Sequence, residues 1–175
     1  MERAPLIRQL NPADRDAFFQ LRLRALLAHP ESFSQSHQEA LQKGPEQYDA
    51  KLQGAQAAEG DFVLGAFAAA DQPLIGAVGL ARNQRLKERH KASVVGMYVA
   101  PEAAGRGVGR ALLTELLARA ERVAGLRQIQ LVVASKNDAA RHLYESAGFR
   151  CYGREIEGLC VDGAFNDADL MARFI

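Results

Sequence analysis

Residues 97–112 have the sequence MYVAPEAAGRGVGRAL, which combines the end of a strand, a glycine-rich turn and the start of a helix. Glycine has no Cβ, so such a turn lets backbone N–H groups approach an anion closely. The N-terminus of the following helix adds positive potential, and the side chains of Arg106 and Arg110 can add charge at the same position. We therefore expect this turn to bind a pyrophosphate.

Two other nucleotide-binding loops contain similar glycines. A Walker A loop requires Lys-Ser or Lys-Thr after its glycines, and neither pair follows Gly109. A dinucleotide-binding loop requires GxGxxG near the first strand, but from Gly105 or Gly107 the third glycine is absent, and this turn lies beyond mid-chain. A dinucleotide oxidoreductase is therefore disfavoured. The glycines alone are also compatible with a helix start that only requires small residues.

A second segment, residues 137–149 with the sequence NDAARHLYESAGF, follows one strand later. Asn137 is a typical N-cap, and Gly148 is typical of a helix C-terminus, so a helix is predicted between them. On that helix Asn137, Ala140 and Tyr144 lie along one edge. In isolation Tyr144 is more typical of a half-buried packing residue than of a catalytic acid.

The remaining chain predicts an alternation of strands and helices around these two segments. Strands are expected at 5–10, 62–69, 74–80, 93–99, 129–133, 149–156 and 170–174. Helices are expected at 11–29, over a stretch that is interrupted at Gly44-Pro45 and ends at Gly54, at 107–125, and at 137–148. The helix from Gly107 has an apolar stripe of Val108, Leu112, Leu116 and Ala120. The order indicates an α/β fold with a mixed sheet of about seven strands and helices on both faces, antiparallel early and parallel across the helix from Gly107.

Length and charge limit the class of protein further. A chain of 175 residues is long enough for one full core and short for two, so we expect a single domain over residues 1–175. Its formal net charge is +1, with both signs interspersed, which argues against nucleic-acid and membrane partners. The longest mostly apolar run, 62–70, is too short to span a bilayer.

The cysteines and the first residues indicate a reduced compartment. Residues 1–10 lack the apolar core of a signal peptide. Cys151 and Cys160 are too few for a disulfide framework, and no CxxC or His/Cys cluster suggests zinc. We expect a cytoplasmic protein without a metal, in which both cysteines are free and act as small apolar fillers rather than nucleophiles.

Together the two segments resemble the motifs of the GNAT superfamily of N-acetyltransferases. The family pattern is V-x-P, then R/Q-x-x-G-x-G/A at a helix start, then N-x-x-A-x-x-L-Y-x-x-x-G-F. The matching residues are Val99, Pro101, Gly107, Gly109, Asn137, Ala140, Leu143, Tyr144, Gly148 and Phe149. One position departs from the pattern, because Ala104 stands where the family has Arg or Gln. The family holds the pyrophosphate mainly with backbone groups, so this loss need not abolish binding.

The resemblance implies how acetyl-CoA is bound. The strand that ends at Val99 diverges from the next parallel strand in similar proteins, and the pantetheine arm lies in the gap. Backbone groups of Met97, Tyr98 and Val99 then pair with that arm, and an N–H on this strand stabilises the oxyanion of the reaction. The implied pyrophosphate site comprises Gly105, Arg106, Gly107, Val108, Gly109 and Arg110, with Asn137 from the second motif.

The resemblance also implies the reaction. An acetyl group passes from acetyl-CoA to a primary amine by direct attack in a ternary complex, and Tyr144 protonates the leaving thiolate. Near the reference pKa values, ~10 for a phenol and ~8.5 for a thiol, that transfer has a small cost. No general base is assigned, because 93–99 contains no acid, and Glu88 and His90 are more typical of a solvated loop.

The acceptor is left open between a small-molecule amine and a protein N-terminus. In relatives the positions of 30–34 and 161–163 line the acceptor cleft. Several acidic residues can attract a cation there, although an ordinary acidic turn is the preferred explanation: Glu155, Glu157, Asp162, Asp167 and Asp169. The family also tends to form homodimers.

A non-catalytic acyl-CoA sensor with the same fold is the alternative function. The presence of Tyr144 argues against a sensor, whereas Ala104 and the missing acid keep that alternative open.

Overall fold

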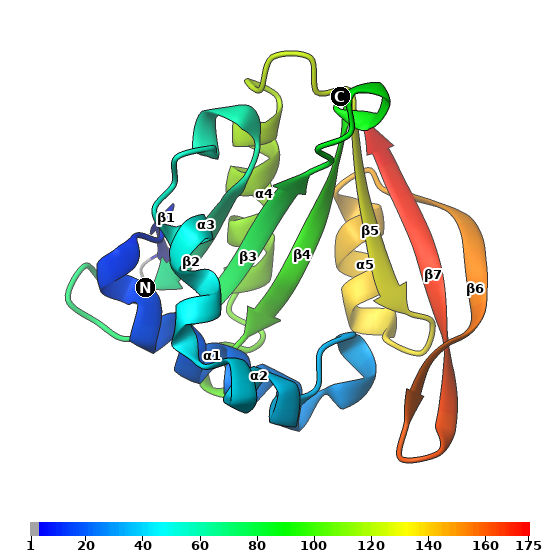
Figure 1. Ribbon diagram of the computed structural model, residues 1–175, viewed down its shortest axis with the longest axis horizontal. Coiled ribbons are helices and arrows are strands. Elements are labelled where there is room, and N and C mark those ends of the chain that lie inside the picture. The colour runs from blue at the N-terminus through cyan, green and yellow to red at the C-terminus, as the bar shows by residue number, and fades with distance from the viewer. Residues whose placement is uncertain (1–3) are drawn as a thin grey trace.

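The computed structural model describes residues 4–175, which form a mixed β-sheet with helices on both faces (Figure 1). The strands are β1 (Leu6–Gln9), β2 (Phe62–Phe67), β3 (Leu74–Arg82), β4 (Lys91–Val99), β5 (Gln128–Ala134), β6 (Arg150–Val161) and β7 (Ala164–Phe174). The helices are α1 (Arg15–Ala28), α2 (His37–Lys43), α3 (Asp49–Leu52), α4 (Val108–Ala120) and α5 (Asp138–Ser146). Short 3-10 helices lie in the connections, among them η2 (Pro30–Ser32), η3 (Pro45–Tyr48), η5 (Leu86–Glu88) and η6 (Pro101–Ala103).

In the described part of the chain the sheet has seven strands in the order β1-β2-β3-β4-β5-β7-β6. Strands β1 to β4 form an antiparallel half, and β5, β7 and β6 form a second antiparallel half. The two halves join where β4 and β5 run parallel, with α4 in the connection between them. The predicted mixed sheet, antiparallel early and parallel across the helix from Gly107, is confirmed.

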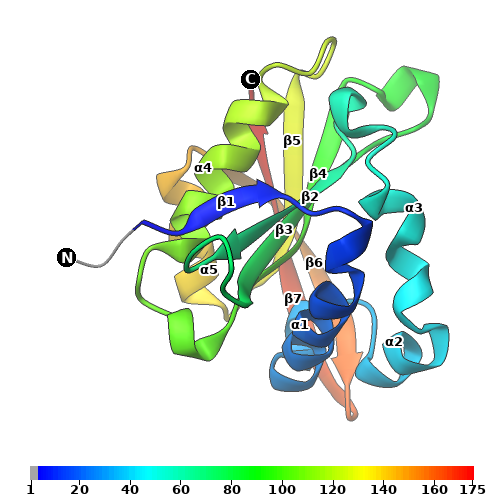
Figure 2. The same ribbon diagram turned by 90° about the vertical axis from the view of Figure 1, so that its left-hand side faces the viewer.

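The helices cover both faces of this sheet. Figure 2 shows α4 and α5 on one face and α1, α2 and α3 on the other. Leu112 and Leu116 of α4 are fully buried in one core, so the predicted apolar stripe of this helix is confirmed. Phe18 and Leu21 of α1 pack with Leu52 of α3 in the second core. Burial of each such side chain stabilises the fold by about 1.5–3 kcal/mol, which fixes the helices on the sheet.

Two predicted elements differ in extent from the observed ones. The helical stretch that ends near Gly54 consists of α2, η3 and α3, and it is broken at Gly44, whose φ is +70°. The last two strands are longer than predicted, because β6 continues to Val161 and β7 begins at Ala164. Most β6 residues are exposed, so backbone pairing rather than an apolar pattern defines this strand.

Both cysteines lie on β6 and are free and exposed. The prediction of free thiols is confirmed, but their description as apolar fillers is wrong, because neither side chain is buried. Of the described helices, none has the length and apolar character needed to cross a bilayer.

Candidate active site

The parallel strands β4 and β5 pair over only a few residues and then separate. Their register covers Lys91 with Gln128 through Ser93 with Gln130, whereas β4 continues to Val99 and β5 to Ala134. Beyond Ser93 the edge of β4 that faces β5 therefore has no partner strand. A cleft of about 630 Å³ occupies the gap and is lined by residues of both strands, α5, the α1–α2 connection and the β6–β7 hairpin.

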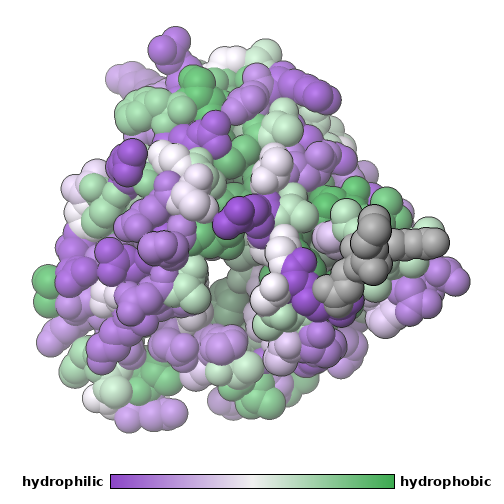
Figure 3. All heavy atoms as spheres, turned by 180° about the vertical axis from the view of Figure 1, so that it is seen from behind, coloured by the Kyte–Doolittle hydropathy of each residue, from purple (hydrophilic) through white to green (hydrophobic). Residues whose placement is uncertain are grey.

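The cleft extends through the molecule rather than into one face only. Figure 3 shows the surface hollowed between the two halves, with an opening visible through the molecule. Ala140 and Tyr144 line the cleft from the α5 face, whereas Phe33 and Ser34 line it from the α1 face. Two reactants can therefore reach one point from opposite faces of the sheet.

A β-bulge shapes the β4 wall of the cleft. Tyr98 pairs with Ala77 and Val95 with Gly79, so β4 contains one more residue than β3 over this interval. Gly96 lies in the bulge with φ +62°, a left-handed conformation that favours glycine. Gly96 and Met97 line the cleft, which brings the backbone of the bulge to its wall. Tyr98 itself is buried in the core on the α1 face.

The glycine-rich turn leaves a cradle of backbone donors at the start of α4. Gly105 and Gly107 have φ values of +74° and +75°, and a Cβ on either would meet no atom within 4 Å. Gly107 is the N-cap of α4 and supplies no side-chain cap. Within residues 4–175 the N–H groups of Gly105, Gly107, Val108 and Gly109 donate no hydrogen bond. Unpaired donors at a helix N-terminus suit an anion, so the turn fits a pyrophosphate.

The charged side chains of this turn lie at the surface. Arg106 and Arg110 are exposed, and Ala104 is also exposed with no group to offer an anion. Gly109 packs closely against the next helix, because a Cβ there would lie 3.4 Å from Leu143. The open side of the turn is thus formed by Gly105 and Gly107, while Gly109 fixes α4 against α5.

The α5 helix presents its predicted edge to the cleft. Asn137, Ala140 and Tyr144 all line it. The side-chain oxygen of Asn137 accepts a hydrogen bond of 3.1 Å from the N–H of Ala140, so this residue caps the helix as well as facing the cleft. The Tyr144 ring packs edge-on against Phe149, with ring centroids 5.9 Å apart. Burial raises the pKa of Tyr144 to about 12, so its hydroxyl stays protonated at neutral pH.

Three carboxylates line the cleft on the side of the α1–α2 connection and the β6–β7 hairpin. Glu31 belongs to η2 in the predicted 30–34 segment, and Glu155 and Asp167 belong to β6 and β7. Asp162 does not line this cleft, because Asp162 and Gly163 form the turn between β6 and β7 at the far end of the hairpin. Glu88 lies in η5, outside the cleft, with an ion pair of 3.2 Å to Lys91. That position agrees with the preferred solvated-loop explanation.

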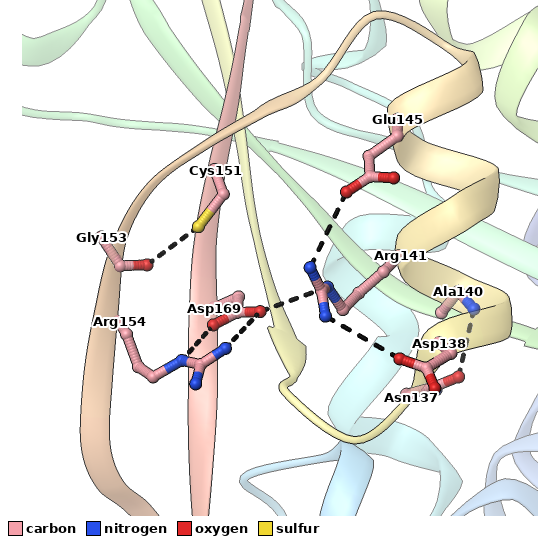
Figure 4. Close-up of polar contacts among 9 residues, drawn as sticks. All are labelled: Asn137, Asp138, Ala140, Arg141, Glu145, Cys151, Gly153, Arg154 and Asp169. Atoms are coloured by element: carbon pink, nitrogen blue, oxygen red, sulfur yellow. Dashed lines mark hydrogen bonds and ion pairs between the residues drawn. The ribbon is translucent and has the colours of Figure 1, made fainter.

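Asp169 differs from the other acidic residues of this region, because it is buried and carries a structural ion pair. It accepts hydrogen bonds of 2.7 and 3.2 Å from Arg154, and Arg141 of α5 lies 3.2 Å away (Figure 4). Arg154, and secondarily Arg141, hold the pKa of Asp169 below its usual value. This carboxylate joins α5 to the β6–β7 hairpin and is not available to a ligand.

Arg22 and Gly96 are among the cleft residues that sequence reasoning missed. Arg22 lines the cleft from α1, and Gly96 forms the bulge on β4. A glycine inside a predicted strand, here Gly96 within 93–99, is a signal for a bulge. No sequence signal distinguishes Arg22 from the other arginines of the same helix.

Comparison with known proteins identifies the family. A family model described as the acetyltransferase (GNAT) family matches residues 22–149. The chain belongs to this family. A spermidine N(1)-acetyltransferase of Vibrio cholerae is 32% identical over 94 residues, which are 54% of this chain and 54% of that relative. The match therefore spans about half the length of this curated relative.

Solved structures described as acetyltransferases have the same fold. An acetyltransferase of the GNAT family from Streptococcus pneumoniae has a TM-score of 0.88 and 27% identity, over 98% of this chain and 100% of that chain. A putative acetyltransferase from Salmonella typhimurium, solved with acetyl-CoA, has a TM-score of 0.81 and 22% identity, over 98% and 94% of the two chains. The predicted GNAT fold is confirmed, and so is the predicted family, the GNAT acetyltransferases.

Proposed function

We propose that this chain transfers the acetyl group of acetyl-CoA to a primary amine by direct attack in a ternary complex. The cleft between β4 and β5 is the observation that carries this proposal, because it opens on both faces of the sheet at one point. The donor enters from the α4–α5 face and the amine from the α1 face. Holding both reactants in one cleft removes the entropic cost of their encounter from the chemical step.

In this proposal acetyl-CoA is bound mainly by backbone groups. The turn Gly105–Arg110 holds the pyrophosphate with the helix dipole of α4 and with four backbone N–H groups, those of Gly105, Gly107, Val108 and Gly109. The unpaired edge of β4 at Met97, Tyr98 and Val99 pairs with the pantetheine amides as an added strand would. Asn137 lines the same wall from the start of α5. The thioester that the donor supplies is the electrophile.

In the reaction the amine forms a C–N bond to the acetyl carbon, the C–S bond breaks, and the amine releases a proton to water, from which Tyr144 later regains the proton that it gives to sulfur. Tyr144 lies on the cleft wall with a protonated hydroxyl and donates to the departing sulfur. The carboxylates of Glu31, Glu155 and Asp167 attract an ammonium group to the opposite side of the cleft. We assign no general base among them.

The acceptor belongs to one of two classes, a small-molecule amine or a protein N-terminus. The spermidine acetyltransferase that this chain resembles favours a small amine, whereas a structural neighbour, NAA60 of Arabidopsis thaliana in complex with a bisubstrate analogue, shares only the fold.

We further propose a cytoplasmic protein of one domain over residues 1–175 that forms a homodimer. Light scattering in solution would measure the assembly state.

A free-thiol assay tests the proposed function. The purified chain is incubated with acetyl-CoA and a panel of polyamines, amino acids, aminoglycosides and peptide N-termini. Thiol release that depends on one class of amine supports an acetyltransferase. Tight acetyl-CoA binding with no release on any amine would instead favour the acyl-CoA sensor.

A further inference from the structure

Arg22 of α1 brings a positive charge into the acceptor side of the cleft. Its guanidinium lies over the ring of Phe33, with 4.8 Å between the guanidinium carbon and the ring centroid. One nitrogen, Nη1, faces the β4 bulge, because a Cβ on Gly96 would lie 3.5 Å from it. Stacking on one side and the bulge on another fix the plane of the group. The residue is one of those that line the cleft.

Within residues 4–175 this guanidinium has neither a hydrogen bond nor an ion pair, and Nη1 is buried from solvent. Arg15 and Arg24, in the same helix, each pair with a carboxylate, at 3.3 and 2.7 Å. A guanidinium stays charged in proteins and offers five N–H donors. A half-buried one without an acceptor is costly unless a ligand supplies the anion.

The cleft carries both signs of charge. Glu31, Glu155 and Asp167 line it together with Arg22, yet none of them pairs with that arginine. A substrate with one ammonium and one carboxylate group would therefore find a partner for each. A polyamine, which carries only positive charge, would leave Arg22 uncompensated.

We propose that Arg22 binds the carboxylate of the acceptor, so that the acceptor is an amine that bears a carboxylate, such as a free amino acid. This inference rests on the proposed function and narrows its substrate class. The planar fork of a guanidinium matches a carboxylate with two parallel N–H···O bonds. Because Phe33 covers a face of the group, an edge remains for an in-plane partner of this shape.

The test compares matched acceptors in the thiol-release assay. Each of the twenty protein amino acids is assayed beside its amide and its decarboxylated amine, with wild type, Arg22→Gln, Arg22→Lys and the control Arg15→Gln. We expect wild type to favour the carboxylate form, and Arg22→Gln to lose roughly 100-fold in kcat/KM on it, mainly through KM. Arg22→Gln should leave the amides unchanged, Arg22→Lys should restore part of the loss, and Arg15→Gln should behave as wild type.

Two results would overturn the proposal. One is a wild-type enzyme that accepts amides or decarboxylated amines as well as the amino acids. The other is an Arg22→Gln variant that loses kcat equally on every acceptor, which would place Arg22 in the chemical step or in the scaffold. Circular dichroism and acetyl-CoA titration check that this variant is folded and binds the donor.

Calorimetry separates this inference from the proposed function. The amino acids are titrated into wild type and Arg22→Gln in the presence of CoA, without any turnover. Binding to wild type that is lost in Arg22→Gln supports the carboxylate site, even if no acceptor releases thiol and the proposed acetyl transfer fails. Binding that is equal in both proteins, or absent for every amino acid, overturns it.

Discussion

At the scale of single residues, the burial of Tyr144 has two opposing effects on its proposed role as a proton donor. Burial keeps its ring fixed against Phe149 but raises its pKa to about 12. That value lies about 3.5 units above a free thiol near ~8.5, so complete proton transfer to a free thiolate costs about 5 kcal/mol. This cost is larger than the one that follows from the reference pKa values. In the proposed reaction the hydroxyl therefore acts as a neutral hydrogen-bond donor that transfers its proton as negative charge develops on sulfur.

Replacing Tyr144 by Phe removes the proton and keeps the packing against Phe149. We expect kcat to fall by roughly 10²–10⁴-fold, with little change in acetyl-CoA affinity, because the donor acts on the leaving group only in the transition state. Steady-state kinetics with an identified acceptor and calorimetry with acetyl-CoA measure the two quantities. If chemistry is shown to limit turnover and kcat of the Tyr144→Phe variant is unchanged, Tyr144 is a packing residue and not the proton donor.

At the scale of elements, the start of α4 depends on backbone conformation more than on side chains. Gly107 has a left-handed φ of +75°, which costs a side-chain-bearing residue about 1–2 kcal/mol. Gly163, in the β6–β7 turn, has a φ of +78° and the same open surroundings. The two glycines differ mainly in location, and this makes them a matched pair for mutation.

Gly107→Glu should abolish acetyl-CoA binding, because the carboxylate occupies the anion cradle and repels the pyrophosphate. Gly163→Glu carries the same backbone strain and the same charge outside the cleft, so it should bind acetyl-CoA as wild type does. Calorimetry measures both affinities, and circular dichroism confirms folding. Equal acetyl-CoA affinity in the two variants would show that the pyrophosphate does not bind at this turn.

The contact between α5 and the β6–β7 hairpin depends on Asp169. Asp169→Asn keeps the volume of the side chain but removes the negative charge with which both Arg154 and Arg141 pair. Solvent screens both arginines in part, so we expect a loss of about 1–2 kcal/mol in unfolding free energy at pH 7. Because the folded pKa of Asp169 lies below its unfolded value, this stability is present above about pH 4 and disappears as the pH falls further.

Urea unfolding of wild type and Asp169→Asn at pH 7, 5 and 3.5 measures this pH dependence. We expect the difference in unfolding free energy between the two proteins to become smaller only at the lowest pH. Asp162→Asn is the control, because it removes one exposed carboxylate from the turn of the same hairpin. A difference that stays constant with pH would show that the charge of Asp169 is not what stabilises the contact.

The elements also show how far the sequence predicts this molecule. Helix α4 and strands β2 to β5 were predictable, because buried faces impose an apolar pattern. The full length of β6 was not, since its side chains are mostly exposed. The separation of β4 from β5 depends on register, which no local pattern encodes, and came only through the family resemblance. Arg22 was missed because its partners, Phe33 and Gly96, lie on other elements.

At the scale of the whole molecule, the sheet consists of two halves that meet through one short parallel contact. The first half contains β1 to β4 and the second contains β5 to β7. The cleft lies where these halves part, and the donor would contact β4 on one side and α5 on the other. A ligand in this position links the halves across the gap, so its binding should be visible in the stability of the whole fold.

Acetyl-CoA at about 100 times its Kd should stabilise the folded state by about 2.7 kcal/mol, since it binds the native chain alone. For a chain of this size that corresponds to a rise in Tm of roughly 5–10 °C. Differential scanning calorimetry measures the shift, which Gly107→Glu should lose, Gly163→Glu should keep, and a metal chelator should not change. Amide hydrogen exchange locates the effect, and we expect protection in 94–99 of β4 and 131–134 of β5, where the strands lack each other as partners. A Tm shift with no protection at these segments would place the donor elsewhere, because a ligand that fills the gap must cover both unpaired edges.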